Sequence, residues 1–445
     1  MDVPMDGWMD GFIVPRALAV VLRVSRCVGI APLRFMKKDD GWRITLARGW
    51  SVYGYICATT IMLVAVIPLL SKDIFIIMRN NIGVTMSCVY TFFVLLVGMT
   101  TIFSATGRMR SMVVCLRHVQ KINHKLSIYH KPMFPDRKKF VVFTFLMITA
   151  FAVICAQFVQ LIIITTTWRI ETWAMICISW WSILIIDMYK MQFIALTMHV
   201  METFKAINDG LRDLLQATAD QNISLQLTFN IRPYKMSKKF KKYSDNVVTC
   251  FPDFRVTKLD GISVIKCPHH ELARRLARAY TAACDVVREV DRAHGPIMLL
   301  VLGLSLFQLV LAAHSFIKNL LDGNASSNFH LIRGLLTLSW CCYCTASLIL
   351  VIEPCHLTLV EMETTQELVS HLMRASHSAD DLLAMELELF FRNLILNEAS
   401  YSPLQVTKLS RSLIITGSRN NEHHGTAHHP DIEQVFALFF LCSNT

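Results

Sequence analysis

Residues Thr172 to Leu215 read TWAMICISWWSILIIDMYKMQFIALTMHVMETFKAINDGLRDLL and join a membrane-like half to a water-compatible half. The first half is apolar enough for a bilayer, yet Asp187 and Lys190 lie within it, one helical turn apart on the face that also carries Trp180. Charge at membrane depth costs free energy, so such residues usually face a protein interior, and a mutual ion pair is their most economical arrangement. From Phe193 onward, apolar residues recur every three or four positions between charged ones. This pattern predicts a membrane helix that continues into water as part of a helical bundle.

The composition indicates a multi-span membrane protein with an all-α fold. Apolar residues make up 53% of the 445-residue chain, and charged residues make up 17%. A transmembrane helix needs about 20 mostly apolar residues to cross about 30 Å of hydrocarbon. The sequence therefore predicts a polytopic membrane helical bundle with six clear spans. They are Trp50 to Leu70, Ile82 to Phe103, Phe140 to Thr167, Thr172 to Thr197, Gly295 to Ile317 and Gly334 to Ile352.

The net charge of +11 is distributed in a way that predicts orientation rather than binding to nucleic acid. Lys and Arg number nine between the second and third runs but one between the third and fourth. Because basic residues accumulate in cytoplasmic loops, this contrast predicts a multi-pass plasma-membrane protein with a cytoplasmic N-terminus. Asn324 then begins a sequon in an outer loop, where we expect glycosylation. The basic run Lys238 to Lys242 falls on the inner side, where it is expected to attract anionic membrane lipid.

Six segments follow from these runs and charges. They are a cytoplasmic N-terminal segment with an interfacial helix (1–49), spans one to four (50–198), cytoplasmic arms with a flexible insertion at about 220–270 (199–294), spans five and six (295–352), a further cytoplasmic arm (353–415) and a polar tail (416–445). The interfacial helix is predicted between Phe12 and Leu33, where apolar residues alternate with Arg.

Three amphipathic stripes lie on the predicted cytoplasmic side. The first continues from Phe193 to Leu214, and the second runs from Leu276 to His294. Such stripes bury their apolar residues against each other or against another subunit, so we expect a cytoplasmic helical anchor bundle. The third stripe consists of Leu368, Leu372, Ala375, Ala379, Leu382, Met385 and Leu389.

No catalytic constellation stands out, so neither an enzyme nor a cofactor or metal is expected. His269-His270-Glu271, for example, lacks the second histidine four residues on that a zinc-protease helix requires.

Polar and aromatic side chains instead accumulate in the membrane halves that are assigned to the outside, Tyr90 among them. Aromatic rings stack on the CH faces of sugars, and Gln, His, Thr and Tyr side chains hydrogen-bond hydroxyl groups, so this mixture suits a small polyhydroxylated ligand. An interfacial aromatic belt is the alternative explanation for Trp181. The candidate ligand residues are Trp180, Trp181, Gln157, Gln160, Gln308, His314, Thr337, Trp340 and Tyr343.

Short motifs along the chain resemble the insect gustatory receptor family. The resemblance runs from about residue 24 to about residue 415, although Asp291 and His294 stand where the family commonly has Asn and Phe. The motifs are Tyr189-Lys190-Met191-Gln192-Phe193, Phe204-Lys205-Ala206-Ile207-Asn208, Val290-Asp291-Arg292-Ala293-His294-Gly295 and, most similar to the fructose-receptor branch, Glu386-Leu387-Glu388-Leu389-Phe390-Phe391 with Tyr401-Ser402-Pro403-Leu404.

The resemblance implies a seven-helix receptor that assembles as a homo- or heterotetrameric, ligand-gated cation channel. It places a sugar or bitter-compound pocket in the outer half of each subunit, and a pore along the seventh helix. The sequence departs from the family there, because it becomes polar from Thr416 to Glu422, and the later apolar run Val435 to Cys442 is too short to cross a membrane. We therefore expect the seventh pore helix to be missing and this chain alone to conduct poorly.

A secondary transporter of a small polar solute is the competing interpretation. Many transporters contain inverted repeats and Gly- or Pro-broken spans around a midplane site. Neither an internal repeat nor a pair of broken spans is visible in this sequence. The channel subunit is therefore favoured.

Overall fold

The computed structural model describes much of the chain between residues 13 and 409. The predicted third span, the predicted insertion up to residue 254 and the tail from residue 410, including the region of the expected seventh helix, lie outside the described residues. Gln157, Gln160 and Asn324 also lie outside them. The described ranges are 13–14, 16–38, 41–69, 82–127, 170–219, 255–259, 262–266, 268–321, 328–376, 381–397, 399–403 and 409.

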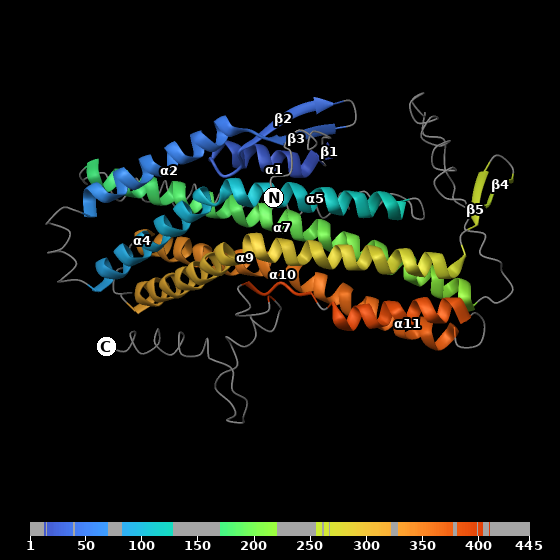
Figure 1. Ribbon diagram of the computed structural model, residues 1–445. Helices are drawn as coiled ribbons and strands as arrows, with labels where there is room; N and C mark the ends of the chain where they lie inside the picture. The colour runs from blue at the N-terminus through green and yellow to red at the C-terminus, as the bar shows by residue number, and fades with distance from the viewer. Residues whose placement is uncertain are drawn as a thin grey trace. The chain divides into compact units, whose positions relative to one another are not determined.

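Long α-helices dominate the described part of the chain (Figure 1). They are α1 (Arg16–Cys27), α2 (Arg48–Leu69), α4 (Ile82–Phe103), α5 (Ala105–Ser127), α7 (Ile170–Ala219), α9 (His269–Leu321), α10 (Asn328–Ser376) and α11 (Asp381–Leu396). Helices α2, α4, α7, α9 and α10 cover five of the six predicted spans. Within the described residues, α7, α9 and α10 are long and apolar enough to cross a membrane, and α4 with α5, bent by 57°, passes the same test as a pair. The predicted helical membrane bundle is confirmed.

The three longest helices extend well beyond the bilayer. Helices α7, α9 and α10 contain 50, 53 and 49 residues, so each is roughly 75 Å long at 1.5 Å per residue. The hydrocarbon core is about 30 Å thick. More than half of each helix therefore lies outside the core, and Figure 1 shows these helices running side by side.

The predicted stripes of α7 and α9 form the core of the bundle. Val200, Phe204 and Leu211 on α7 are fully buried. The ring of Phe204 lies edge-on to Tyr280 of α9 with centroids 5.5 Å apart, and Tyr280 lies edge-on to Phe390 of α11 at 5.8 Å. Fully burying a large apolar side chain stabilises the fold by about 1.5–3 kcal/mol, so this shared core holds the three helices together.

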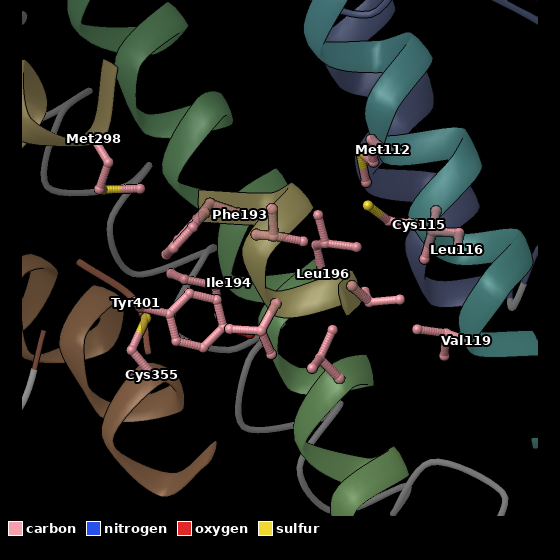
Figure 2. Packing of buried hydrophobic residues seen from close by; sticks show 14 of the residues in the cluster. Met112, Cys115, Leu116, Val119, Phe193, Ile194, Leu196, Met298, Cys355 and Tyr401 are labelled. Carbon is pink, nitrogen blue, oxygen red and sulfur yellow. The ribbon is translucent and has the colours of Figure 1, made fainter. Parts of the chain in front are cut away.

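A second part of the same core lies between α5, α7 and α10, as Figure 2 shows. Phe193 and Leu196 project from α7, with Cys115 of α5 on one side and Cys355 of α10 on the other. The ring of Tyr401, which follows α11 in the chain, meets Phe193 edge-on with centroids 6.3 Å apart. Tyr401 thereby connects the segment after α11 to the middle of α7.

The predicted third stripe is divided between two helices, and its second half is not buried within one chain. Helix α10 ends at Ser376 and α11 begins at Asp381, so the pattern does not belong to one helix. Leu382, Met385 and Leu389 are about half exposed, and Ala375 is exposed as well. A new helix has its own rotation about its axis, so counting in threes and fours across the junction does not identify the face that is buried within this chain. The buried face of α11 carries Leu383, Leu387, Phe390 and Leu394.

The N-terminal segment contains a small sheet besides the expected helix. Helix α1 covers the first part of the predicted interfacial helix and is followed by Gly29, whose φ of 91° favours glycine. Strands β1 (Ile13–Val14), β2 (Leu33–Lys38) and β3 (Gly41–Leu46) then form an antiparallel sheet in the order β1-β3-β2. The alternation of apolar and Arg residues therefore predicted α1 but missed this sheet.

A second hairpin, β4 (Arg255–Leu259) with β5 (Ile262–Lys266), lies in the range predicted as a flexible insertion. The charge and proline content of that range did not predict it.

Candidate ligand-binding site

An ion pair within α7, in the predicted membrane-spanning part of the helix, is hydrogen-bonded to α10. The Nζ of Lys190 lies 3.2 Å from Oδ1 of Asp187 and donates a hydrogen bond of 3.0 Å to Oγ of Ser347. The hydroxyl of Tyr343 donates to the second carboxylate oxygen, Oδ2 of Asp187. Both charged residues are buried, and buried charge is tolerated when it is paired and hydrogen-bonded in this way. The four side chains form a neutral polar network between the two helices.

A small cavity borders this network. Its volume is about 10 Å³, which is room for about one water molecule, and four helices supply its walls. Known small-molecule sites are typically 300–1,000 Å³ and mostly apolar with a few polar groups. This cavity has that mixed character but is far smaller, so a sugar fits only if the helices around it separate. Its lining consists of Tyr90 and Val94 of α4, Ile183, Ile186, Asp187 and Lys190 of α7, Leu304, Ser305 and Gln308 of α9, and Tyr343 of α10.

Aromatic rings extend from this cavity along α7 and α10. Trp180 lies edge-on to Trp340 with ring centroids 6.0 Å apart, and Trp340 lies 5.2 Å from Tyr343. Trp180 precedes Asp187 by two helical turns, which corresponds to roughly 10 Å along the axis. The rings therefore form a continuous wall that leads to the ion pair.

The sequence-predicted ligand residues divide into two groups. Trp180, Gln308, Trp340 and Tyr343 lie at the cavity or on the aromatic wall beside it. The structure does not bring the exposed Trp181 and His314 or the half-buried Thr337 to the cavity. Trp181 follows Trp180 by one position, and 100° of helix rotation turns it to another face.

Two serines at this site were not predicted. Ser305 lines the cavity and Ser347 binds Lys190. A serine in an apolar helix is usually a packing residue, and its hydroxyl often bonds the carbonyl four residues back, as Ser305 does to Val301. No signal in the sequence separates these two serines from the others.

A second polar layer lies beside the ion pair, at the bend between α4 and α5. The buried guanidinium of Arg108 donates through Nη1 to the Thr101 carbonyl at 3.2 Å and to Ser104 Oγ at 3.1 Å. Its Cζ lies 4.5 Å from the ring centroid of Tyr189, which favours a cation–π interaction. The Tyr189 hydroxyl in turn donates to the carbonyl of His294 at 3.0 Å. This chain of contacts connects the bend to α7 and α9.

The arrangement offers hydrogen-bonding groups and ring faces around a space for about one water molecule, and it has no resemblance to a hydrolytic or redox centre. It offers a carboxylate acceptor, an ammonium donor, an amide, hydroxyls and ring faces within one cavity. Among the residues that the structure describes, no group of three or more His, Cys, Asp and Glu side chains has a metal-site arrangement.

The long apolar helices define a multi-pass helical membrane protein. The family model of the 7tm chemosensory receptors matches residues 18–416, so the chain belongs to that family. The predicted resemblance to the insect gustatory receptors is thereby confirmed. The family is one of receptors rather than of enzymes.

One curated relative of this chain is a receptor for sugar taste. The chain is 26% identical over 143 residues to the gustatory receptor for sugar taste 43a of Drosophila melanogaster. The match spans 32% of this chain and 32% of that receptor. It therefore covers about a third of the length of its relative.

Proposed function

We propose that this protein is a gustatory receptor subunit of the plasma membrane, a ligand-gated non-selective cation channel that responds to a small fructose-like sugar. The observation that carries the proposal is the cavity, because it combines an Asp187–Lys190 pair with an aromatic wall. Sugar hydroxyls hydrogen-bond charged and amide groups, and the CH face of a sugar ring stacks on indole. The partial match to a receptor for sugar taste supports the same ligand class.

The mechanism follows from the size of the cavity and the length of the helices. A sugar enters from the outer half and widens the cavity by separating α7 from α10, and its hydroxyls replace the bonds between Tyr343 and Asp187. Helix α10 continues for more than two turns beyond its predicted span and packs along α7 there. A displacement at the cavity is therefore transmitted along both helices to the arms outside the bilayer.

The Asn208 contacts are the point where the arms receive this movement. The amide of Asn208 on α7 donates to the Glu361 carbonyl of α10 at 2.8 Å, and Thr365 donates to Oδ1 of Asn208 at 2.6 Å. These contacts couple the cavity to the arms only if the helices have two arrangements, before and after the displacement, and both are populated.

The subunit functions as a homo- or heterotetramer with related receptors, and its arms lie in the cytoplasm. Apolar residues exposed on α11 support assembly, because Leu382, Met385, Leu389 and Leu396 have half or more of their surface uncovered in one chain. The excess of Lys and Arg before the first span and between the second and third supports the cytoplasmic position.

The test is whole-cell recording from cells that lack other chemoreceptors, with a panel of sugars applied to this chain alone and together with a full-length relative. Sugar-evoked cation current in either arrangement supports the proposal, and current in the second arrangement alone indicates a subunit that needs a conducting partner. Absence of current in both, at normal surface expression, would contradict it.

A matched pair of tryptophan variants separates the cavity from the rest of the membrane surface. Trp340→Ala removes a ring of the aromatic wall, and we expect the half-maximal sugar concentration to rise about tenfold, which corresponds to about 1.4 kcal/mol. Trp181→Ala removes an exposed ring of the same size and should leave the concentration unchanged. If the two variants had equal effects, the cavity would not be the sugar-binding site.

The second candidate function is a secondary transporter of a small polar solute, which the buried Asp187–Lys190 pair also suits. Uptake of labelled sugar without current would favour it.

A further inference from the structure

The β2–β3 hairpin has one apolar face and one basic face. Paired residues of antiparallel strands share a face, and neighbours along a strand alternate. The pairs Leu33–Leu46, Phe35–Ile44 and Lys37–Trp42 belong to the mainly apolar face, where Leu33 and Ile44 are buried. The pairs Arg34–Thr45, Met36–Arg43 and Lys38–Gly41 belong to the opposite face. Three basic residues therefore share one face of a two-stranded ribbon.

Helix α1 covers the apolar face and adds to the basic character of the unit. The guanidinium of Arg23 lies 3.6 Å from the ring centroid of Trp42, and that of Arg26 lies 4.5 Å from the ring centroid of Trp50. Val20 and Val24, one turn apart on α1, are 55% and 46% exposed. Between residues 13 and 69, acidic residues occur only at positions 39 and 40, between β2 and β3 in the sequence. Basic side chains in the same range number eight.

The unit is attached directly to the first membrane span. The hydroxyl of Tyr53 in α2 donates to the Cys27 carbonyl at 3.1 Å. Gly29 and Gly54 approach so closely that a Cβ on Gly54 would lie 2.6 Å from the Gly29 carbonyl oxygen. Figure 1 shows α1 and the hairpin beside the start of α2. Because Ala47 alone separates β3 from α2, the hairpin ends directly before α2, which covers the first predicted span.

We propose that the basic face of the β2–β3 hairpin binds anionic phospholipid head groups, specifically phosphatidylserine, of the cytoplasmic leaflet. The exposed Arg34 binds a phosphate or carboxylate group, since guanidinium binds such oxyanions with paired hydrogen bonds, and the strand register places Lys38 and Arg43 on the same face. Met36, which lies on the basic face and is 38% exposed, rests against the boundary of the acyl chains. Eight basic side chains against two acidic ones supply the charge complementarity.

The proposal rests on the cytoplasmic orientation given under the proposed function, but its consequence is separate from sugar sensing. A hairpin that binds lipid fixes the start of α2 relative to the bilayer surface. It also makes the position of α2, which packs on α7, depend on the charge of the inner leaflet.

The experiment is hydrogen–deuterium exchange of the full chain in nanodiscs that contain phosphatidylcholine alone or phosphatidylcholine with phosphatidylserine. We expect backbone amides of residues 33–46 to exchange at least threefold more slowly when phosphatidylserine is present, and the difference to shrink at high salt. Arg34→Glu should abolish the difference, and the milder Arg34→Gln should reduce it. The matched control is Lys121→Glu, a charge reversal at an exposed position of α5, which should leave the difference intact.

Equal exchange in the two lipid compositions would overturn the proposal, because apolar contact alone does not depend on head-group charge. An equal effect of Lys121→Glu and Arg34→Glu would also overturn it, because the lipid response would then reflect total charge. Displacement of the lipid effect by an acidic peptide at low concentration would assign the face to a protein partner instead. Protection of the hairpin by phosphatidylserine in a protein that gives no sugar-evoked current would support this proposal while contradicting the proposed function.

Discussion

The replacement Asp187→Ala tests the ion pair most directly. It leaves the Lys190 ammonium buried, with Ser347 Oγ as its remaining hydrogen-bond acceptor among the described residues, and it removes the acceptor of the Tyr343 hydroxyl. Removing one partner of a buried pair typically costs 3–5 kcal/mol, because the remaining charge is uncompensated. Total stabilities are about 5–15 kcal/mol. We therefore expect Asp187→Ala to be recovered poorly at the cell surface.

Two further variants separate charge from packing. Asp187→Asn keeps an oxygen that accepts from Tyr343 but loses the charge, so we expect a smaller loss, about 1.5–3 kcal/mol. The double replacement Asp187→Leu with Lys190→Met removes both charges and keeps apolar volume, and buried pairs exchanged in this way are often neutral. It should therefore be more stable than Asp187→Ala.

The assay has three parts. Thermal unfolding in detergent is monitored by size-exclusion chromatography, surface labelling reports expression, and sugar-response curves report function. Single and double variants at positions 187 and 190 form a cycle whose non-additivity measures the coupling. Strictly additive losses would refute the claim that the two residues stabilise the fold as a pair. A selective loss of sugar affinity at normal stability and expression would place Asp187 in direct contact with the ligand instead.

Three further replacements test the packing around this site. His294→Phe should raise the unfolding temperature in detergent, because both ring nitrogens of His294 are buried without a hydrogen-bond partner in the described structure; a lower temperature would show that the imidazole is satisfied. Gly54→Ala should cost about 1–3 kcal/mol, because its Cβ would meet the Gly29 carbonyl oxygen at 2.6 Å, and wild-type yield and thermal stability would argue against this close approach. Asn208→Leu should speed amide exchange in the arms of α7 and α10, because it removes the bonds to Glu361 and Thr365; unchanged protection would remove Asn208 from the proposed coupling.

Much of the helical architecture was predictable, because periodicity is a property of the order of residues along one helix. The stripe that contains Val200, Phe204 and Leu211 is buried as its spacing predicts. The pair Asp187–Lys190 was equally predictable from the sequence, since residues three apart on a helix are neighbours whatever surrounds them. The family resemblance also rests on local motifs, and the match over residues 18–416 agrees with it.

What the sequence alone determined, then, was the set of apolar runs, the stripes within single helices and the i, i+3 ion pair. The tertiary structure decided which helices meet: Gln308 of α9 and Tyr343 of α10 reach one cavity, whereas Trp181 and His314 do not. It also decided the rotation of α11, where Leu383 rather than Leu382 is buried. The physical reason is that hydrophobic period specifies a face within one helix, whereas the rotation and crossing of neighbouring helices depend on how their side chains interlock.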